Sequence, residues 1–246
     1  MDTTTVLLIA ALMGLIAVLY TSVGHAGASG YLAIMALFAV PAATMRPTAL
    51  VLNIIVASFT TFRFARAGQV NWRLLLLFVA GAVPAAFIAG LITLPGNIYR
   101  PLVGMILLLA AARLLWPREI ARLGDPKPPN MAIGVASGAA IGFLSGLTGT
   151  GGGIFLSPLI LFCGWEAVRK TSGIAAGFIL CVSIAGLAGN LSSVGGLPPE
   201  LPYFIGAVAL GALVGTQLGL SRLPANRLLQ ALGCVLVVAG AKLILS

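Results

Sequence analysis

The sequence predicts an all-α polytopic membrane protein built from two inverted repeats, and three observations support that prediction. Apolar residues make up 60% of the chain and charged residues only 8%, a balance far from that of soluble domains. Long apolar stretches, such as 74–92 and 101–116, must be helical because an unpaired backbone group in lipid is very unfavourable. The second half also repeats the first, and a glycine-rich break interrupts each half.

The duplication can be followed through matched positions in the two halves. Gly27–Gly30 matches Gly149–Gly153, and Leu94–Asn97 matches Leu223–Asn226. An internal duplication with interrupted hydrophobic segments at equivalent positions is typical of transporters whose binding site lies at the repeat interface. The sequence therefore indicates a transport protein.

Each half is expected to hold about five hydrophobic segments. The first half gives 3–23, 30–41, 47–64, 72–92 and 98–116, and the second half gives 131–148, 153–163, 171–190, 201–221 and 226–245. Most of them are long enough to cross a hydrocarbon core of about 30 Å. The second segment of each half, at about 1.5 Å per residue, reaches only roughly half way. These two segments are expected to be half-helices that start at the glycine breaks, either re-entrant or paired with another short segment.

The charges predict how the segments cross the membrane. We expect one transmembrane domain with a first repeat over 1–116, a cytoplasmic linker over 117–130 and a second repeat over 131–246. Inverted repeats place eleven basic residues on the cytoplasmic side and three on the other, whereas parallel repeats give eight and six. Because basic residues concentrate in cytoplasmic loops, the inverted arrangement is favoured. Both termini are then extracytoplasmic, and the protein is expected to be multi-pass in the cell inner (cytoplasmic) membrane.

The two breaks are candidate anion sites. Interrupting a helix leaves up to four N–H groups without partners, and the macrodipole adds about half a positive charge there. Two such starts, at Gly30–Tyr31 and Gly152–Ile154, are expected to converge near the midplane and to bind an oxyanion. The candidate substrate-binding residues are His25, Gly27, Ser29, Gly30, Asn53, Thr148, Thr150, Gly151, Gly152 and Gly153. The alternative is close helix packing, which is the role expected of Gly138, Gly142, Gly146, Gly211, Gly215 and Gly219.

Ionisable and polar residues are few within the predicted spans. None of the spans contains Asp or Glu, which disfavours a cation as substrate because cation transporters use buried carboxylates. His25 could bind or protonate an anion, or it could hydrogen-bond a neighbouring carbonyl and stabilise the loop. Asn53 could contact the substrate or join two helices. Arg46 and Arg169 begin matching helices and could be vestibule charges, but they are expected to anchor the chain at the membrane interface.

Other chemistry is not indicated. Cys163, Cys181 and Cys234 are expected to be small apolar side chains, with a thiol relay as the alternative. No metal-ligand spacing, nucleotide-binding loop or nucleophile–base pair occurs, so we expect neither an enzyme nor a cofactor. The net charge of +9 is assigned to loops that face an anionic leaflet, and no nucleic acid is expected as a partner.

The glycine breaks carry a resemblance to a known family. The run from Gly149 to Pro158, together with the related run from Ser22 to Tyr31, is similar to the sulfite exporter TauE/SafE family, and the resemblance covers the whole chain. The second run fits the family pattern through Gly149, Gly151, Gly152, Gly153 and Pro158. The first run departs from it, with Ser29 and Tyr31 in place of glycines and Ala36 in place of the proline, so the site is expected to be asymmetric.

The resemblance implies membrane transport of small sulfur oxyanions or organosulfonates. An inside-negative potential is worth about 2.3 kcal/mol per charge per 100 mV, so an anion moves outward downhill. The expected function is therefore export of sulfite or an organosulfonate through a central site at the repeat interface. The alternatives are import of thiosulfate or another reduced sulfur compound, and a membrane accessory subunit that transports nothing. The expected partners are the small sulfur oxyanion and the lipid bilayer, and the sequence is compatible with a homodimer.

Overall fold

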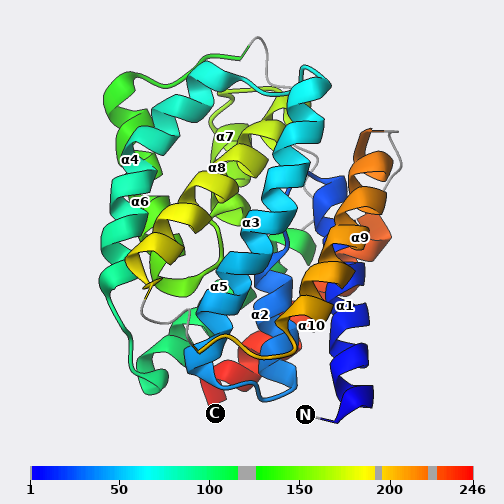
Figure 1. Cartoon of the computed structure of the whole chain (residues 1–246). Helices are drawn as coiled ribbons and strands as arrows, with labels where there is room; N and C mark the ends of the chain where they lie inside the picture. Colours follow the sequence, from blue (N-terminus) through cyan, green and yellow to red (C-terminus); the bar gives the residue numbers. More distant parts are fainter. Residues whose placement is uncertain (1, 116–125, 192–195, 221–225, 246) are drawn as a thin grey trace.

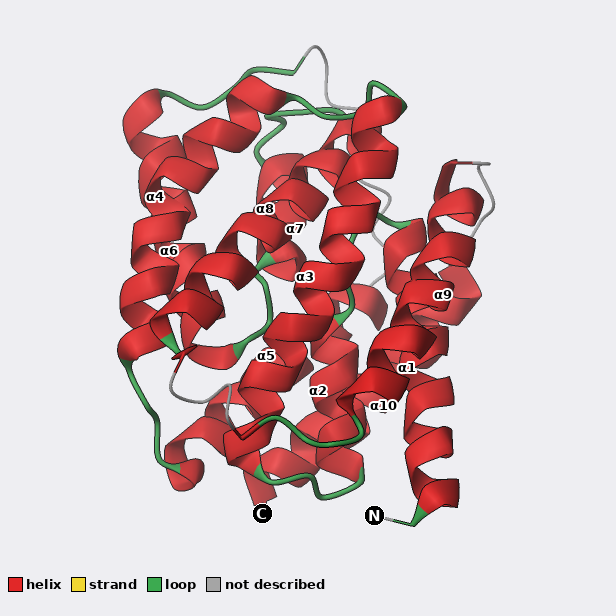
Figure 2. Cartoon of the chain, in the orientation of Figure 1, coloured by secondary structure: helices red, strands yellow, loops and turns green. Residues whose placement is uncertain are grey.

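The computed structural model describes residues 2–115, 126–191, 196–220 and 226–245, and within these ranges the chain is helical and contains no strand (Figures 1 and 2). The first half provides α1 (Thr3–Ser22), α2 (Ala28–Leu37), α3 (Ala42–Arg66), α4 (Trp72–Leu91) and α5 (Gly96–Leu115). The second half provides α6 (Met131–Thr148), α7 (Gly153–Phe162), α8 (Val168–Gly189), α9 (Leu201–Leu220) and α10 (Asn226–Leu245). Most of the linker expected over 117–130 lies outside the described residues.

The helix lengths confirm a polytopic membrane protein. Six of the described helices, α1, α3, α4, α6, α8 and α9, are long and apolar enough to cross a membrane. The second helix of each half is different, because α2 and α7 have only ten residues each. At about 1.5 Å per residue they cover roughly 15 Å, or half of a hydrocarbon core. The two predicted short helices are therefore present, each directly after a glycine break.

Four helix starts differ from the sequence prediction, among them α5, which starts at Gly96 rather than at 98. Helix α2 starts at Ala28 rather than at 30, because Gly27 adopts a left-handed conformation (φ 103°) and caps the helix. Gly152 does the same for α7 (φ 75°), so Gly27 is structurally equivalent to Gly152 rather than to Gly149. Helices α3 and α8 start at Ala42 and Val168, several residues before the predicted 47 and 171. The prediction placed these starts where the apolar runs begin, but both helices include an earlier turn with basic residues.

Glycine seams hold the long helices together in pairs. Helix α6 packs along α4, and a Cβ on Gly138, Gly142 or Gly146 would lie within 2.5 Å of a carbonyl oxygen of α4. Helix α9 packs along α1 in the same way, through Gly211, Gly215 and Gly219. Such close backbone approach needs residues without a Cβ. The packing role predicted for both glycine series is confirmed.

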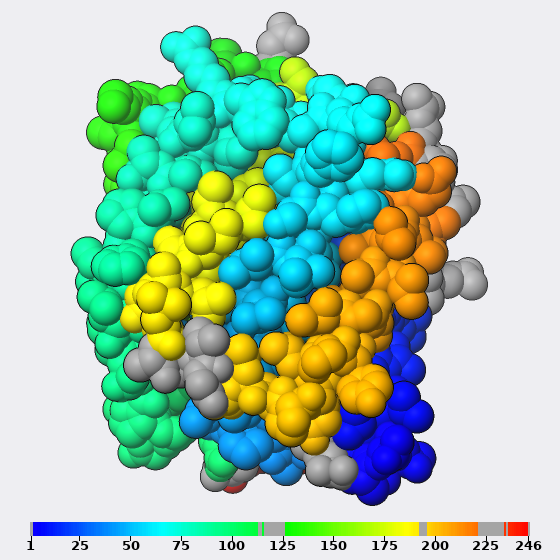
Figure 3. All heavy atoms as spheres, viewed as in Figure 1, coloured from blue at the N-terminus to red at the C-terminus, as the bar shows by residue number. Residues whose placement is uncertain are grey.

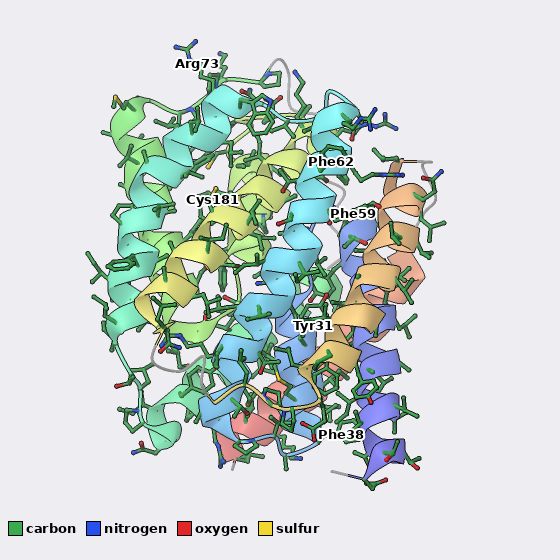
Figure 4. All side chains as sticks on the ribbon, viewed as in Figure 1. Tyr31, Phe38, Phe59, Phe62, Arg73 and Cys181 are labelled. Atoms are coloured by element: carbon green, nitrogen blue, oxygen red, sulfur yellow. The ribbon has the colours of Figure 1, made fainter. Side chains whose placement is uncertain are left out.

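The helix pairs surround a central crossing. Helices α3 and α8 run antiparallel in the middle of the bundle, where Asn53 of α3 meets Ser183 of α8. Figure 3 shows α3, α8 and α9 closely packed side by side on one face. Both termini lie at the lower edge in Figure 1, whereas Arg73, at the start of α4, projects from the upper end in Figure 4. Exchanging the two halves turns the pair α1–α9 into the pair α6–α4, as two-fold related repeats require; the inverted arrangement itself stays a prediction.

Candidate functional site

The first break consists of residues 23–27, between the end of α1 and the start of α2. Gly24 and Gly27 are both left-handed, with φ of 79° and 103°. The Tyr31 hydroxyl donates a hydrogen bond to the Ala26 carbonyl (2.6 Å) and closes the loop from the helix that follows it. A Cβ on Gly27 would lie 2.9 Å from that hydroxyl oxygen. Tyr31, labelled in Figure 4, is fully buried, whereas Val23 and His25 of the break are half-buried.

The second break consists of residues 149–152, between α6 and α7. Gly149, Gly151 and Gly152 are all left-handed. A Cβ on Gly151 would lie 2.6 Å from the Asn53 amide nitrogen, and one on Gly152 would lie 2.5 Å from the Ser145 hydroxyl. Backbone conformation and crowding therefore both require glycine here.

His25 connects the two breaks. Its Nδ1 is 3.2 Å from the Val23 carbonyl oxygen, and its Nε2 is 3.0 Å from the Gly153 carbonyl oxygen and 3.2 Å from the Ser157 hydroxyl. Because a carbonyl only accepts, a neutral ring that donates from Nδ1 can accept only from Ser157, whereas a protonated ring donates to both carbonyls. The loop-stabilising role considered for His25 is thus present in the structure, and it extends across the two halves.

A buried polar cluster surrounds the second break. The Thr148 and Thr150 hydroxyls are 3.0 Å apart, and the Tyr99 hydroxyl donates to the Thr148 carbonyl (3.0 Å). The Asn53 amide donates to the Ser183 hydroxyl (3.3 Å), which joins α3 to α8. The Asn53 Oδ1 and the Ser145 hydroxyl are buried and have no hydrogen-bond partner. The cluster therefore retains unused polar groups next to Gly151 and Gly152.

The predicted site residues lie in three places. His25, Asn53, Thr148, Thr150 and the glycines 151–153 surround the start of α7. Ser29 and Gly30 instead face α1: the Ser29 hydroxyl bonds the Tyr20 hydroxyl (2.6 Å), and Gly30 packs against Ile16. Gly27 caps α2 in the first break. The two helix starts are thus linked through His25, and the contacts of Ser29 and Gly30 do not reach the second break.

Several polar residues of the region were not among the predicted site residues, namely Tyr99, Ser145, Ser157, Ser183 and Arg46. Ser157 lies one turn after Gly153 on α7, and helical spacing places these two on one face, which was a usable signal. Arg46 was expected to anchor the chain at the membrane interface, and the structure shows that protein covers it. It is only 5% exposed, and it donates to the carbonyls of Ala89, Gly90 and Ile92 (2.8–3.0 Å) at the end of α4. These acceptors are distant from Arg46 in the sequence, so no local pattern around Arg46 indicated them.

Both half-helices begin without a side-chain cap. The N-cap residues Gly27 and Gly152 have no side chain, and no side chain in the described part of the structure caps either N-terminus. The first N–H groups of an α-helix have no intrahelical acceptor, and the macrodipole makes this end positive. The arrangement suits an anionic or carbonyl-type acceptor placed against the start of α7.

A bundle of membrane-spanning helices with two half-helices linked in its interior has the architecture of a polytopic membrane transporter. Comparison with known proteins identifies the family, because residues 7–243 match the model of the sulfite exporter TauE/SafE family. The chain belongs to this family. It is 40% identical over 232 residues to the probable membrane transporter protein y4hK of Sinorhizobium fredii, covering 93% of this chain and 94% of that protein.

A more distant relative is the probable membrane transporter protein MJ0441 of Methanocaldococcus jannaschii. It is 26% identical over 149 residues, which cover 59% of this chain and 55% of that protein. No solved structure matches the chain significantly. The relatives' names describe membrane transporters and specify neither a substrate nor a direction.

Proposed function

We propose that the protein is an inverted-repeat permease that exports a small sulfur oxyanion, sulfite or an organosulfonate, across the cytoplasmic membrane. The observation that carries this proposal is the uncapped start of α7, which lies among buried hydroxyl and amide groups that lack partners. Unpaired N–H groups and the positive end of a helix dipole form a binding site for anions. The family match adds weight, since the family model is described as a sulfite exporter.

The substrate contacts follow from this arrangement. The N–H groups at Gly152 and Gly153 face the anion, and the hydroxyls of Ser145, Thr148 and Thr150 can donate to its oxygens. The Asn53 amide lies beside Gly151 and can turn its nitrogen toward the anion. His25 contributes from the first break, where its ring links the two halves at Gly153. Ser29 and Gly30 support the binding site indirectly, by seating α2 against α1.

Movement of one repeat against the other gives access to this site. Asn53, Thr148 and Thr150 are all buried, so solvent does not reach them in the present conformation. The two halves meet at polar contacts, His25 with Ser157 and Asn53 with Ser183, that can break and re-form. Rocking of the repeats around a fixed central site would open it alternately to each side of the membrane.

The proposed direction follows from charge. None of the described helices contains Asp or Glu, the groups with which a transporter ordinarily binds a coupling cation. An anion leaving a cell with an inside-negative potential gains about 2.3 kcal/mol per charge per 100 mV. Export therefore needs no coupling ion, whereas uptake of the same anion does.

Efflux from proteoliposomes tests the proposal. Purified protein is reconstituted, and efflux of sulfite, sulfoacetate, thiosulfate and sulfate is measured under an imposed potential. The expected result is potential-dependent efflux of sulfite or sulfoacetate. Uptake of thiosulfate alone would indicate an importer of reduced sulfur. Absence of flux for every anion, in protein that is folded and monodisperse, would indicate an accessory role and overturn the proposal.

A further inference from the structure

Arg46 differs from the other basic residues of the described part of the chain. It is the one charged side chain among the buried polar residues of that part, although it lies in the second turn of a membrane-spanning helix, α3. A buried charge in a membrane is costly, and such residues generally mark a pathway for a substrate or ion. The burial of Arg46 therefore needs an explanation other than anchoring at the membrane interface.

The charge of Arg46 is only partly compensated. Its guanidinium donates to three carbonyls of the α4 C-terminus, and no carboxylate among the described residues pairs with it. Its Nε is buried and has no hydrogen-bond partner. The C-terminal end of a helix carries about half a negative charge, so a net positive charge remains inside the protein. A buried guanidinium in this state favours an anion nearby.

The position of Arg46 is next to the second break. A Cβ on Gly149 would lie 3.2 Å from the Arg46 carbonyl oxygen and 3.3 Å from its Cγ. The first break makes the corresponding contact with the start of α8, where a Cβ on Gly24 would lie 2.5 Å from the Ser172 Cβ. Each break thus rests on the beginning of the long helix that follows the half-helix of the other half. The residue in contact with the break is a buried arginine in one case and a serine in the other, and the two cations at the start of α8, Arg169 and Lys170, are exposed.

We propose that Arg46 is a charge-selecting residue for the anion on one side of the site only, the side on which both termini lie. Helix α3 begins near the lower edge of Figure 1, as do both termini, and Arg46 lies in the second turn of that helix, in contact with the second break. An anion moving between the break and this face passes a buried positive charge, whereas on the opposite side Ser172 touches the break and the nearby cations, Arg169 and Lys170, are exposed. The inference rests on the proposed anion transport and adds that binding is electrostatically asymmetric.

Three variants separate charge from packing. Transport of the anion that the wild type carries is measured in vesicles of known protein orientation, with substrate added to one face at a time. We expect Arg46→Gln to raise the half-saturating concentration about tenfold from the face of the termini, as for one partly screened charge interaction, and to leave the other face within about threefold. Arg46→Lys keeps the charge and should stay close to the wild type. Arg100→Gln, a control without contact to the break, should change neither face.

The variant Arg46→His separates an effect of charge from a loss of folding, because one and the same protein is compared at two pH values. An unperturbed histidine titrates between pH 5 and 8, so the side chain in Arg46→His is charged at pH 5.5 and neutral at pH 8. Relative to the wild type at each pH, this variant should bind the anion about tenfold more tightly at pH 5.5 than at pH 8. The difference should appear only from the face of the termini. An equal change from both faces, or His and Gln variants that behave alike at both pH values, would mean that Arg46 only caps α4. Failure of the wild type to transport any anion would refute the proposed function instead.

Discussion

Gly152 combines two requirements that only glycine satisfies. Its φ of 75° is left-handed, and a Cβ there would lie 2.5 Å from the Ser145 hydroxyl. It is also the N-cap of α7, so its conformation sets the direction in which the first N–H groups of that helix point. Backbone strain and substrate binding therefore depend on the same residue.

Gly152→Ala should lower both stability and transport. A side chain in the left-handed region costs about 1–2 kcal/mol, and displacement of Ser145 adds to it. Thermal unfolding in detergent should show a lower Tm, and efflux of the substrate should fall by more than the loss of folded protein explains. Gly206→Ala is the matched control, because Gly206 lies in α9 with nothing within 4 Å of its Cβ position. An unchanged Tm for Gly152→Ala would contradict the argument.

His25 and Ser157 should act as one unit. They form a hydrogen bond of 3.2 Å between the first break and α7, and intramolecular bonds of this kind contribute about 1 kcal/mol. In a double-mutant cycle of His25→Ala and Ser157→Ala, the double variant should be less destabilised than the sum of the single variants, by a coupling energy of about that size. Unfolding free energies measured in one detergent provide the test. Strict additivity would show that the contact is not energetically significant.

The residues of the site differ in how far the sequence could predict them. The glycines and His25 stand out because glycine clusters and a lone histidine are rare inside apolar segments. The burial of Arg46 was not predicted, since its three acceptors lie at the C-terminal end of α4, beyond any local pattern. The contacts of Ser29 and Gly30 with α1 depend on how α2 folds back along that helix, which residue types alone do not determine.

At the scale of single elements, the C-terminal end of the half-helix α2 needs hydrogen-bond donors from outside the helix. Helix α2 ends at Leu37, and the N–H groups that follow it satisfy the carbonyls of 34–36 but not that of Leu37. The ammonium group of Lys242, from α10, donates to the Leu37 carbonyl at 2.8 Å. A cation at a helix C-terminus also interacts favourably with the macrodipole. The last helix of the chain thus stabilises the first half-helix.

Lys242→Met should therefore destabilise the protein modestly. We expect a loss of about 0.5–1 kcal/mol, the usual value of a cation at a helix C-terminus, and a partial rescue in Lys242→Arg. Thermal unfolding at low salt measures the change most clearly, since salt screens it. Lys127→Met is a suitable control, because the Lys127 side chain makes no hydrogen bond in the described structure. Equal Tm values for the two Met variants would argue against the cap.

The sequence predicted where the helices lie, but it did not predict the correct alignment of the two halves. All ten segments appear close to their predicted ranges because hydropathy determines which stretches enter the membrane. The alignment of the two breaks was wrong by three residues, because Gly149 was matched to Gly27 by residue type alone. The left-handed caps make Gly27 equivalent to Gly152 instead. Backbone conformation, which no residue-type match reports, decides that alignment.

For the whole molecule, the pairing of helices is the main support for a two-fold relation between the halves. Helix α1 runs parallel to α9, and α6 runs parallel to α4, as successive glycine contacts along each pair require. Helices α3 and α8, which are equivalent in the two halves, cross each other antiparallel. Antiparallel equivalent helices are what an axis in the membrane plane produces, so the proposed inversion has a direct consequence for topology.

The inversion predicts that both termini lie outside the cytoplasm and that the connection between the halves lies inside. A cytoplasmic connection also places Arg66, Arg73 and Arg169, at the ends of α3, α4 and α8, on the side that attracts basic residues. Fusions at the C-terminus should show alkaline phosphatase activity and no fluorescence from green fluorescent protein, whereas fusions after residue 130 should show the reverse. Reporter activities that place the C-terminus and residue 130 on the same side would exclude inverted repeats. In that case the second half would have to cross the membrane an even number of times, and one of the half-helix breaks would face the opposite side from the one proposed.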